Sequence, residues 1–340
     1  MLDWTEEKLN VLLSAPSDRL LADMKKIKGD IIFLGAGGKM GPTLCLLAHN
    51  AAKKAGLSIK VTAVSRFTDP LAVKLLKDNG IETISSDLLE RGALEKLPDS
   101  PNVVFMAGKK FGTAGNEYFT WAMNAWLPAD VAKRYKNSSI AVFSSGNIYG
   151  ETPVHTGGSA EDARPAPAGE YAMSCLGRER MFEYAAHAFK TKVAVCRLNY
   201  AIDLRYGVLF DIAEKVFNDE PVSLSMPVFN CIWQNDANEI VLRSLLHAGS
   251  NVFYINVSGP ETASVYFTAN KFAELFGKKA RFCGEPSGTA LLCNTGKMAE
   301  LFGYPAVSLT EMIKLQAEWI MSGGRSLGKA THFEEKKGEY

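Results

Sequence analysis

A glycine-rich turn is the first segment whose residue types could do chemistry. Gly35, Gly38 and Gly41 recur at every third position, after the apolar run Ile31–Leu34 and before a segment of helical periodicity. Glycines at this spacing allow a tight turn, close backbone approach to a pyrophosphate and close helix packing. The N–H groups that begin the helix would then face the phosphates. The predicted dinucleotide site also includes the other residues of the turn: Gly37, Lys39, whose side chain either approaches a phosphate or is solvated, and Met40.

The end of the second apolar run, Ile59–Val64, bears on the choice of cofactor. An Asp or Glu at this position would bind the ribose 2′-hydroxyl of NAD. The chain instead continues with Ser65 and Arg66, and the first acid is Asp69. A guanidinium pairs bidentately with phosphate oxygens, so the sequence favours NADP over NAD. The alternative is a solvent-facing Arg66 at the start of a loop.

Hydroxyl groups form the other chemically suggestive set. Ser144 and Ser145 follow the apolar run Ile140–Phe143, which places them at the carboxyl end of a predicted strand. Doubly wound sheets bind their ligands at that edge. Tyr171 begins a helical segment a short loop later.

These residues depend on an alternation of strands and helices for their placement. Short apolar runs are typical of parallel strands that are covered on both faces, and their alternation with helical segments predicts an α/β fold, a Rossmann-type doubly wound parallel sheet. The expected strands are Ile31–Leu34, Ile59–Val64, Val103–Met106, Ile140–Phe143 and Val193–Leu198, and the expected helices are Pro42–Ala55, Leu71–Asn79, Tyr118–Tyr135 and Tyr171–Phe189.

The alternation loosens after Ala201, which predicts a smaller, discontinuous C-terminal substrate lobe. Two short helices, Thr5–Leu13 and Ser17–Lys28, are expected before the sheet, packed on the main domain and separated by Pro16. Asn235–Leu246 and Val252–Val257 are expected to return to the sheet. The predicted divisions are an N-terminal helical extension (1–28), a Rossmann domain (29–202 with about 232–260), a substrate lobe (203–231 and 261–327) and a polar tail (328–340), either mobile or laid on a partner.

Composition narrows the class of protein. The net charge is +1 over 340 residues, so we expect neither nucleic acid nor a membrane surface as a partner. No apolar run reaches the length of a membrane span, and the first residues lack a signal-peptide core. The six cysteines and five histidines lack metal-like spacing, so no metal is expected. A reduced, cytoplasmic location is the simplest interpretation.

Over residues 29–325 the chain resembles the extended short-chain dehydrogenase/reductase family, the NAD-dependent epimerase/dehydratase group. The segments that carry the resemblance, in order, are the GxxGxxG turn, Asp87-Leu88, Ala107-Gly108, Asn124, the SSxxxYG segment from Ser144, Glu161-Asp162 before Tyr171, Arg197-Leu198-Asn199, Asp236, Tyr254–Pro260 and Gly303-Tyr304 through Trp319. The resemblance implies that Ser145 is the catalytic serine, Tyr171 the acid/base tyrosine and Asp87 an adenine ligand. It also implies that Ala107, Gly108 and Lys109 flank the cofactor and that Asn124 steadies the active site.

The chain departs from this family at one position. The family motif is YxxxK, but the fourth residue after Tyr171 is Cys175. Residues four apart share a helix face, so the usual lysine lies beside the tyrosine and lowers its pKa. Without a lysine, the Tyr171 pKa should stay near about 10, which makes the phenol a poor base. It can still donate a proton to a carbonyl oxygen.

Three interpretations follow from Cys175. Another cation replaces the lysine, with Lys110, Lys109 or Arg178 as candidates; or the reaction is a reduction, lyase or isomerase step that needs little base strength; or catalysis is lost and the protein is a cofactor-binding sensor. Cys175 itself is either an active thiol or, as we favour, a small residue that fills space, since no activating base is adjacent.

Substrate and assembly are less strongly indicated. Arg205, Tyr206, Asn230 and Trp233 are candidates for a pocket in the small lobe, and residues 203–235 offer no clear basic site for a second pyrophosphate. This favours a small sugar-like substrate, either a free sugar or a sugar acid. The resemblance implies a homodimer through the helices that bear Asn124 and Tyr171. Trp121 and Trp126 would then be core or dimer-contact residues.

Overall fold

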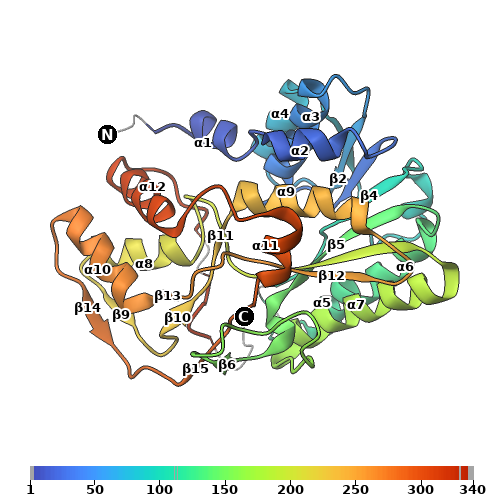
Figure 1. Ribbon diagram of the computed structural model, residues 1–340. Helices are drawn as coiled ribbons and strands as arrows, with labels where there is room; N and C mark the ends of the chain where they lie inside the picture. Colours follow the sequence, from blue (N-terminus) through green and yellow to red (C-terminus); the bar gives the residue numbers. More distant parts are fainter. Residues whose placement is uncertain (1–3, 111, 113, 329–330, 336–340) are drawn as a thin grey trace.

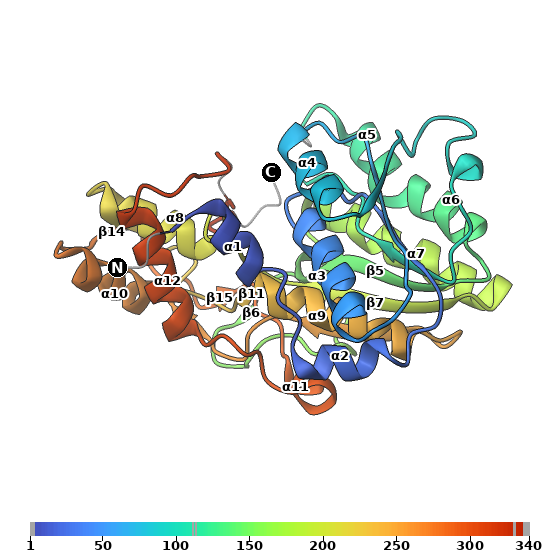
Figure 2. The ribbon, with the colours of Figure 1, turned by 90° about the horizontal axis from the view of Figure 1, so that it is seen from above.

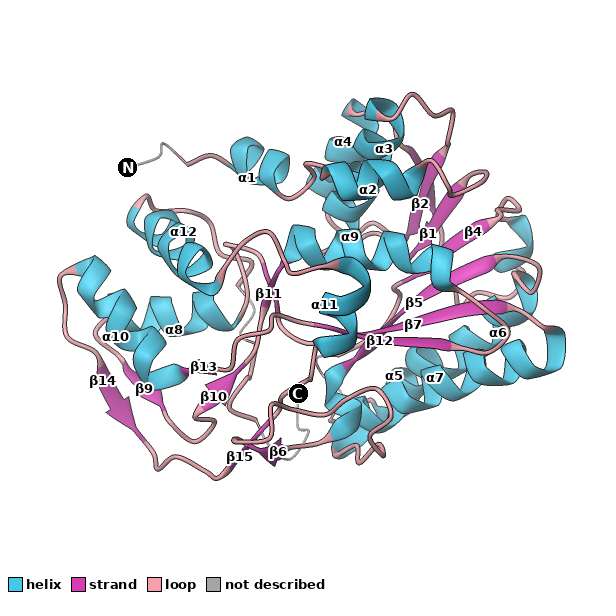
Figure 3. Ribbon diagram, viewed as in Figure 1, coloured by secondary structure: helices cyan, strands magenta, loops and turns pink. Residues whose placement is uncertain are grey.

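The computed structural model describes residues 4–110, 112, 114–328 and 331–335. Its centre is a seven-stranded parallel sheet in the order β3-β2-β1-β4-β5-β7-β12 (Figure 1, Figure 3). The chain builds outward from β1 to β3 and returns to place β4 beside β1, so the topological switch point lies between β1 and β4. The strands are β1 (Ile31–Leu34), β2 (Val61–Ser65), β3 (Glu82–Ser85), β4 (Asn102–Phe105), β5 (Ser139–Ser145), β7 (Lys192–Leu198) and β12 (Phe253–Val257).

The register of the strands aligns their carboxyl ends. Leu34 at the end of β1 lies opposite Val64 of β2 and Phe105 of β4. Phe105 in turn lies opposite Val142 of β5. The turns that follow β1, β4 and β5 therefore open at one edge of the sheet, as the sequence predicted.

Helices cover both faces of the sheet because side chains alternate along each strand. Ile31 and Phe33 of β1 join one apolar core, and Ile32 and Leu34 join the other. The first face carries α2 (Asp18–Met24), α3 (Gly41–Lys54), α4 (Pro70–Asp78), α9 (Gln234–Ser244) and α11 (Gly296–Phe302); the second carries α5 (Glu117–Trp121), a π-helical turn (Ala122–Trp126), α6 (Leu127–Arg134) and α7 (Gly169–Phe189) (Figure 1). The predicted doubly wound α/β fold is confirmed.

A smaller lobe lies beside the carboxyl edge of the sheet (Figure 2). Its core is formed by α8 (Val208–Phe217), α10 (Val265–Phe276) and α12 (Leu309–Met321). Short strands outside the main sheet pair with one another. The pairs are β6 (Thr152–Pro153) with β15 (Thr289–Ala290), β8 (Ala201–Ile202) with β11 (Ile232–Trp233), β9 (Pro221–Ser223) with β14 (Arg281–Cys283), and β10 (Val228–Phe229) with β13 (Ala263–Ser264). Within the described residues, 3₁₀ turns complete the fold at Leu94–Lys96, Gly146–Tyr149 and Leu245–His247.

The N-terminal helices do not share one packing partner. Leu20 and Met24 of α2 lie in the sheet-side core, as expected. Leu9 of α1 (Glu6–Leu12) and the following Leu13 are instead buried in the core of the small lobe. The expectation that both helices pack on the main domain is therefore wrong for α1, which lies between the lobe and α3 (Figure 2).

Two segments near the C-terminus also differ from the expected divisions. α11 falls within the range predicted for the small lobe, but Met298 and Phe302 pack in the sheet-side core. In the predicted polar tail, Phe333 is buried in the core of the small lobe, so residues 331–335 lie on this chain itself. Residues 329–330 and 336–340 of that tail lie outside the described residues. No helix among the described residues is long and apolar enough to cross a membrane.

Candidate functional site

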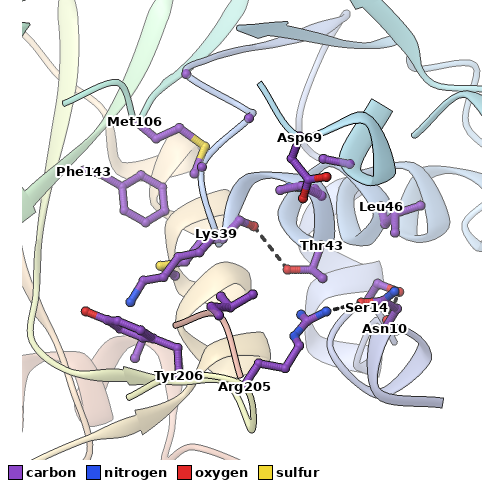
Figure 4. A pocket seen from close by; sticks show the side chains of 18 of the residues that line it. Asn10, Ser14, Lys39, Thr43, Leu46, Asp69, Met106, Phe143, Arg205 and Tyr206 are labelled. Carbon is purple, nitrogen blue, oxygen red and sulfur yellow. Dashed lines mark hydrogen bonds between the residues drawn. The ribbon is translucent and has the colours of Figure 1, made fainter. Parts of the chain in front are cut away.

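One cavity of about 1480 Å³ lies at the carboxyl edge of the sheet and continues toward the small lobe (Figure 4). The turns after β1 and β4 and the end of β5 all contribute to its wall. The expected site residues that line it are Gly35, Gly37, Gly38, Lys39, Met40, Gly108, Lys109, Lys110, Ser145 and Tyr171. Gly41, Ser65, Arg66, Asp87, Leu88, Ala107, Asn124 and Cys175 lie outside this lining, behind it or at its margin.

The glycine turn has the shape of a backbone cradle. Gly35 has φ +98°, and a Cβ there would lie 2.4 Å from the backbone nitrogen of Ala107. A Cβ on Gly41 would lie 2.1 Å from the carbonyl oxygen of Ala36. At Gly38, by contrast, a Cβ would meet a single described atom within 4 Å, the carbonyl oxygen of Gly35 at 3.8 Å. The turn is thus closed against the protein and open toward the cavity, a shape that fits a diphosphate.

The start of α3 adjoins this cradle. Met40, the N-cap residue, makes no side-chain cap bond. The Gly41 N–H donates to the carbonyl oxygen of Gly38 at 3.1 Å, and Pro42 has no N–H, so the cradle depends on the glycine turn more than on the first helical donors. The Met40 side chain itself is buried in the sheet-side core. The Lys39 ammonium lies 3.1 Å from the centre of the Tyr206 ring, so it reaches across the cavity to the small lobe (Figure 4).

The end of β2 carries an ion pair. Arg66 Nη1 lies 3.7 Å from Asp87 Oδ2, and the Arg66 side chain is 56% exposed. Ser65 closes against the turn, because a Cβ on Gly37 would lie 2.5 Å from its Oγ. Leu88 is buried in the core beneath them. A carboxylate therefore does lie near the end of β2, although it comes from the loop after β3 rather than from β2 itself.

The two serines at the end of β5 have different environments. The Ser144 hydroxyl donates to Glu179, which also pairs with the buried Arg197, so Ser144 belongs to a buried network. The Ser145 hydroxyl donates to Asn147 Oδ1 at 3.0 Å and contacts the Tyr171 hydroxyl. Only Ser145 therefore combines a place in the cavity wall with a contact to the tyrosine.

Tyr171 lies in the first turn of α7, and its pKa is raised well above the ordinary value. Burial is the largest cause and Cys175 adds to it, whereas Arg178 and Ser145 act in the opposite direction. The sequence predicted a pKa near the ordinary value without the family lysine; burial raises it further. The phenol is thereby kept protonated and able to donate at neutral pH.

Cys175 contacts Tyr171 but does not line the cavity. It is fully buried in a small apolar cluster with Ile148, Tyr149 and Cys293. Burial also raises the pKa of its thiol. These surroundings support the interpretation of Cys175 as a packing residue, because nucleophilic cysteines need a thiolate and access to a substrate.

Of the three cations considered as replacements for the lysine, Lys110 lies beside Tyr171. Its ammonium is 5.8 Å from the centre of the Tyr171 ring. Loss of hydration lowers the pKa of Lys110 to about 8, an effect opposed by Cys175 and Asp211. The Lys109 ammonium instead lies 4.8 Å from the centre of the Phe119 ring.

Arg178, the third cation, also lines the cavity, but its guanidinium is held by the protein around it. It is buried and donates to the carbonyl oxygen of Phe143 at 2.6 Å and to Asn124 Oδ1 at 2.8 Å. A Cβ on Gly108 would lie 2.4 Å from the Arg178 guanidinium. Arg178 thus supports the loop after β4 and acts on Tyr171 only through its charge.

Asn124 ties the loop that carries Lys110 to the helices behind it. Its side chain binds both the N–H and the carbonyl oxygen of Lys109, each at 2.9 Å. It also donates to Ser174 Oγ at 2.9 Å. Asn124 lies in the π-helical turn, a geometry that is frequent at functional sites.

The small lobe contributes charged residues that the sequence only partly predicted. Arg205 and Tyr206 line the cavity as expected. Asn230 and Trp233 do not: Asn230 donates to the carbonyl oxygen of Cys293 at 2.7 Å, and Trp233 is buried in the lobe core. Their assignment to the pocket was wrong, because no local pattern reveals which side of a short strand faces the cavity.

An ion-pair cluster at the cavity wall was missed altogether. Glu6 of α1 pairs with both Arg205 and Arg325, and Asp203 holds Arg205 from the other side at 2.6 Å. Asn147 and Thr331 were also missed, although both line the cavity. Nothing in the local sequence marks Glu6, Arg325 or Thr331, because folding alone brings these distant segments together.

Trp121 and Trp126 are not core residues. They are 39% and 69% exposed and line a shallow groove of about 550 Å³ between the helical segment 117–134 and α7.

No group of three or more His, Cys, Asp or Glu side chains among the described residues could hold a metal ion.

In sequence, part of the chain matches a known protein family. A model of the NAD dependent epimerase/dehydratase family matches residues 31–202, half of the chain. These residues include the glycine turn, Lys110, Ser145 and Tyr171. No curated protein matches the chain.

Solved structures give matches in fold. UDP-glucuronic acid 4-epimerase from Bacillus cereus, in complex with NAD, is 19% identical with a TM-score of 0.69 and covers 86% of this chain and 96% of its own. UDP-glucose 4-epimerase from Thermotoga maritima, with UDP-glucose, is 18% identical with a TM-score of 0.70, covering 86% and 99%. The UDP-Glc/GlcNAc 4-epimerase from Campylobacter jejuni is 17% identical with a TM-score of 0.69, covering 86% and 99%.

Proposed function

The chain belongs to the NAD dependent epimerase/dehydratase family, and on this premise we propose that it is an NAD(P)-dependent oxidoreductase acting on a hydroxyl or carbonyl of a sugar or sugar-derived small molecule. The observation that carries the proposal is one cavity whose wall contains both the open glycine turn and the Ser145–Tyr171 pair. A diphosphate on the turn and a reacting oxygen at the hydroxyls would share that cavity.

Each protein group then has a distinct task. The nicotinamide, when bound, supplies or accepts a hydride. Ser145 hydrogen-bonds the reacting oxygen, and Tyr171 donates the proton that this oxygen takes up. Lys110 supplies the positive charge that the family normally places at position 175. A tyrosine with a raised pKa is a better proton donor than acceptor, so carbonyl reduction is the favoured direction at neutral pH.

Two alternatives remain from the sequence. An epimerase or dehydratase of the same family would oxidise its substrate transiently and retain the cofactor, as suits the 4-epimerases of similar fold. A non-catalytic sensor would bind the dinucleotide and do no chemistry. The contact of Tyr171 with Ser145 and its proximity to Lys110 favour catalysis over the sensor.

For the cofactor, the proposal is NADP in preference to NAD. The exposed guanidinium of Arg66 at the end of β2 supports it, because Arg66 could exchange its long 3.7 Å pair with Asp87 for a 2′-phosphate. Against it stands the similar B. cereus structure, which holds NAD. Asp87 would favour NAD if its carboxylate left Arg66 and accepted hydrogen bonds from the ribose hydroxyls.

For the substrate, the proposal is a free sugar or sugar acid rather than a nucleotide sugar. Arg205 and Arg325 converge on the carboxylate of Glu6 in the cavity wall. Their charges are already balanced by Glu6 and Asp203, which leaves little for a second pyrophosphate.

A homodimer in the cytoplasm completes the proposal. The exposed Tyr118, Trp121 and Trp126 along the helical segment 117–134 support a contact through this helix and α7. All six cysteines are free, which suits a reducing compartment.

A panel assay tests this function. Purified protein is mixed with sugar acids, free sugars and UDP-sugars in the presence of NADPH or NADH, and nicotinamide absorbance and sugar NMR spectra are recorded. Net cofactor turnover with a sugar acid supports the oxidoreductase. Interconversion of sugars without cofactor turnover identifies the epimerase. Binding of the dinucleotide without conversion of any sugar in the panel would favour the sensor and contradict the proposed chemistry.

A further inference from the structure

Lys110 touches a segment that lies 221 residues away in the sequence. Its Nζ donates to the carbonyl oxygen of Thr331 at 3.5 Å, and the same ammonium lies 5.8 Å from the centre of the Tyr171 ring. Thr331 is buried and lines the cavity. The C-terminal part of the chain therefore reaches the candidate active site.

This part of the chain is firmly anchored on the small lobe. The N–H of Thr331 donates to Asp211 Oδ2 at 2.8 Å, and its hydroxyl binds the same oxygen. Two residues later, Phe333 is 1% exposed in the lobe core. Between the two anchors, His332 has φ +53°. Residues other than glycine adopt this left-handed backbone conformation only when the surrounding structure holds them in it.

The charges around Lys110 suit a held ammonium. The Asp211 carboxylate on α8 favours the charged form of Lys110. The Thr331 carbonyl adds a dipole whose negative end faces Nζ. Cys175 and Tyr171 face it from α7, and burial raises the pKa of both groups. The Asp211 carboxylate and the Thr331 carbonyl, both from the small lobe, thus hold the poorly hydrated Lys110 ammonium next to the Tyr171 phenol.

We propose that residues Thr331–Phe333 form a clasp that positions Lys110 at Tyr171, so that the C-terminal segment is an integral part of the active site. The inference rests on the proposed function in one respect, the role of Lys110 as the replacement cation. In the family motif the lysine is fixed by the helix that carries the tyrosine. Here the cation comes from a loop, and a loop side chain needs a second support to hold one geometry.

The test uses the full chain with substitutions in the clasp. Thr331→Val removes the hydroxyl contact with Asp211 but keeps the shape, and Phe333→Ala removes the apolar anchor. Glu334→Gln is the matched control, because it weakens a partly exposed ion pair with Lys215 at the end of the same segment and leaves the Thr331–Asp211 hydrogen bonds in place. Displacing a catalytic group by about an ångström costs up to about a hundredfold in rate. We expect kcat to fall about tenfold to a hundredfold in the first two variants and to stay unchanged in the control, with KM and dinucleotide affinity within about twofold.

Rescue separates positioning from mere loss of structure. Cys175→Lys restores a lysine on the tyrosine helix, which needs no clasp. Added to Phe333→Ala, it should recover most of the lost kcat. A clasp variant that loses activity and is not rescued, while its thermal unfolding matches wild type, would overturn the proposal, as would clasp variants of undiminished kcat.

A second readout does not depend on turnover. The lysines are labelled by reductive ¹³C-methylation, and the Lys110 signal is assigned as the one missing from Lys110→Arg. Its titration is then followed by NMR. Wild type should titrate near 8, and release of the clasp should raise the pKa toward the ordinary lysine value as the ammonium regains water. An unchanged titration in Phe333→Ala and Thr331→Val overturns the clasp even if no substrate is ever found. A changed titration in a protein without activity supports the clasp and counts against the proposed function alone.

Discussion

The ammonium of Lys110 lies 5.8 Å from the centre of the Tyr171 ring. Lys110 comes from the loop after β4, whereas the family motif takes its lysine from the helix that carries the tyrosine. The position left by that lysine is filled by Cys175, which is fully buried. Charge and packing, which one side chain normally combines, are thus divided between two residues on different elements.

Restoring the helix lysine should increase oxidation at neutral pH. In Cys175→Lys the ammonium lies on the same helix face as Tyr171 and lowers its pKa. Because each unit of that shift gives about tenfold more tyrosinate, we expect a rise of at least about tenfold in the rate of alcohol oxidation. Initial rates of NADP reduction measure it. Cys175→Ala is the control and should match wild type; a large loss there would show that the thiol takes part.

Replacing Lys110 should have opposite effects on activity and stability. Lys110→Met removes the cation beside Tyr171, and we expect kcat to fall about a hundredfold, the usual scale of lost acid–base assistance. Lys109→Met, whose ammonium lies over Phe119, should keep most of the activity. Equal losses in both variants would contradict the assignment of Lys110.

The stability effect follows from the pKa of Lys110, lowered from 10.5 to about 8 by desolvation. Between these values the unfolded chain binds more protons than the folded chain, so stability rises with pH. Below pH 8 both states are charged and the full cost of burying the ammonium applies. Lys110→Met should therefore stabilise the protein at neutral pH by up to about 3 kcal/mol, and this gain should disappear above about pH 10.5. Urea unfolding at several pH values checks both the sign and the window.

The choice of dinucleotide should depend on Arg66. Charged hydrogen bonds contribute about 1.5–3 kcal/mol, so Arg66→Ala should weaken NADP binding about tenfold to a hundredfold. NAD binding should change little or improve, since Asp87 loses its pair with Arg66 and can accept from the ribose hydroxyls. Titration calorimetry with both cofactors measures the difference, and Arg91→Ala, an exposed arginine, is the control. Equal weakening of both cofactors would argue that Arg66 supports the loop and does not read the phosphate.

Assembly should be sensitive to the exposed aromatic groove. A glutamate in place of Trp126 puts a charge on a side chain that is 69% exposed in the single chain. If the dimer forms there, Trp126→Glu should sediment as a monomer at concentrations where the wild type is a dimer. Tyr304→Glu, at a similar 70% exposure elsewhere, should leave the dimer intact. A wild type that is itself monomeric would refute the proposed contact.

The sequence predicted the sheet and the cradle well because both depend on local patterns. β1 and β5 are apolar runs that end at a glycine. Glycine is required at position 41 because a Cβ there would meet Ala36, and at position 35 because a Cβ would meet Ala107 after the neighbouring strand. The Ser145–Tyr171 contact could be expected from a family motif, since both residues lie at the ends of elements whose order is fixed by the fold.

The rest of the site could not be predicted because it depends on contacts between distant segments. Glu6 meets Arg325 across nearly the whole length of the chain, and Thr331 reaches Lys110 only after the small lobe has folded. The raised pKa of Tyr171 follows from burial, which sequence spacing does not report. Residues 331–335 were expected in a solvated tail because two acidic residues follow the one apolar side chain that anchors them, Phe333.

Binding of the dinucleotide is the claim on which every assigned role depends. Titration calorimetry of the purified chain with NADPH, NADP, NADH and NAD tests it, with a Gly38→Asp variant as the control because its side chain would enter the open side of the cradle. We expect saturable binding of one dinucleotide per chain, tightest for the 2′-phosphorylated forms and abolished by Gly38→Asp. If the wild-type protein gives neither heat nor competition with any of the four cofactors, the dinucleotide site and the roles built on it are wrong.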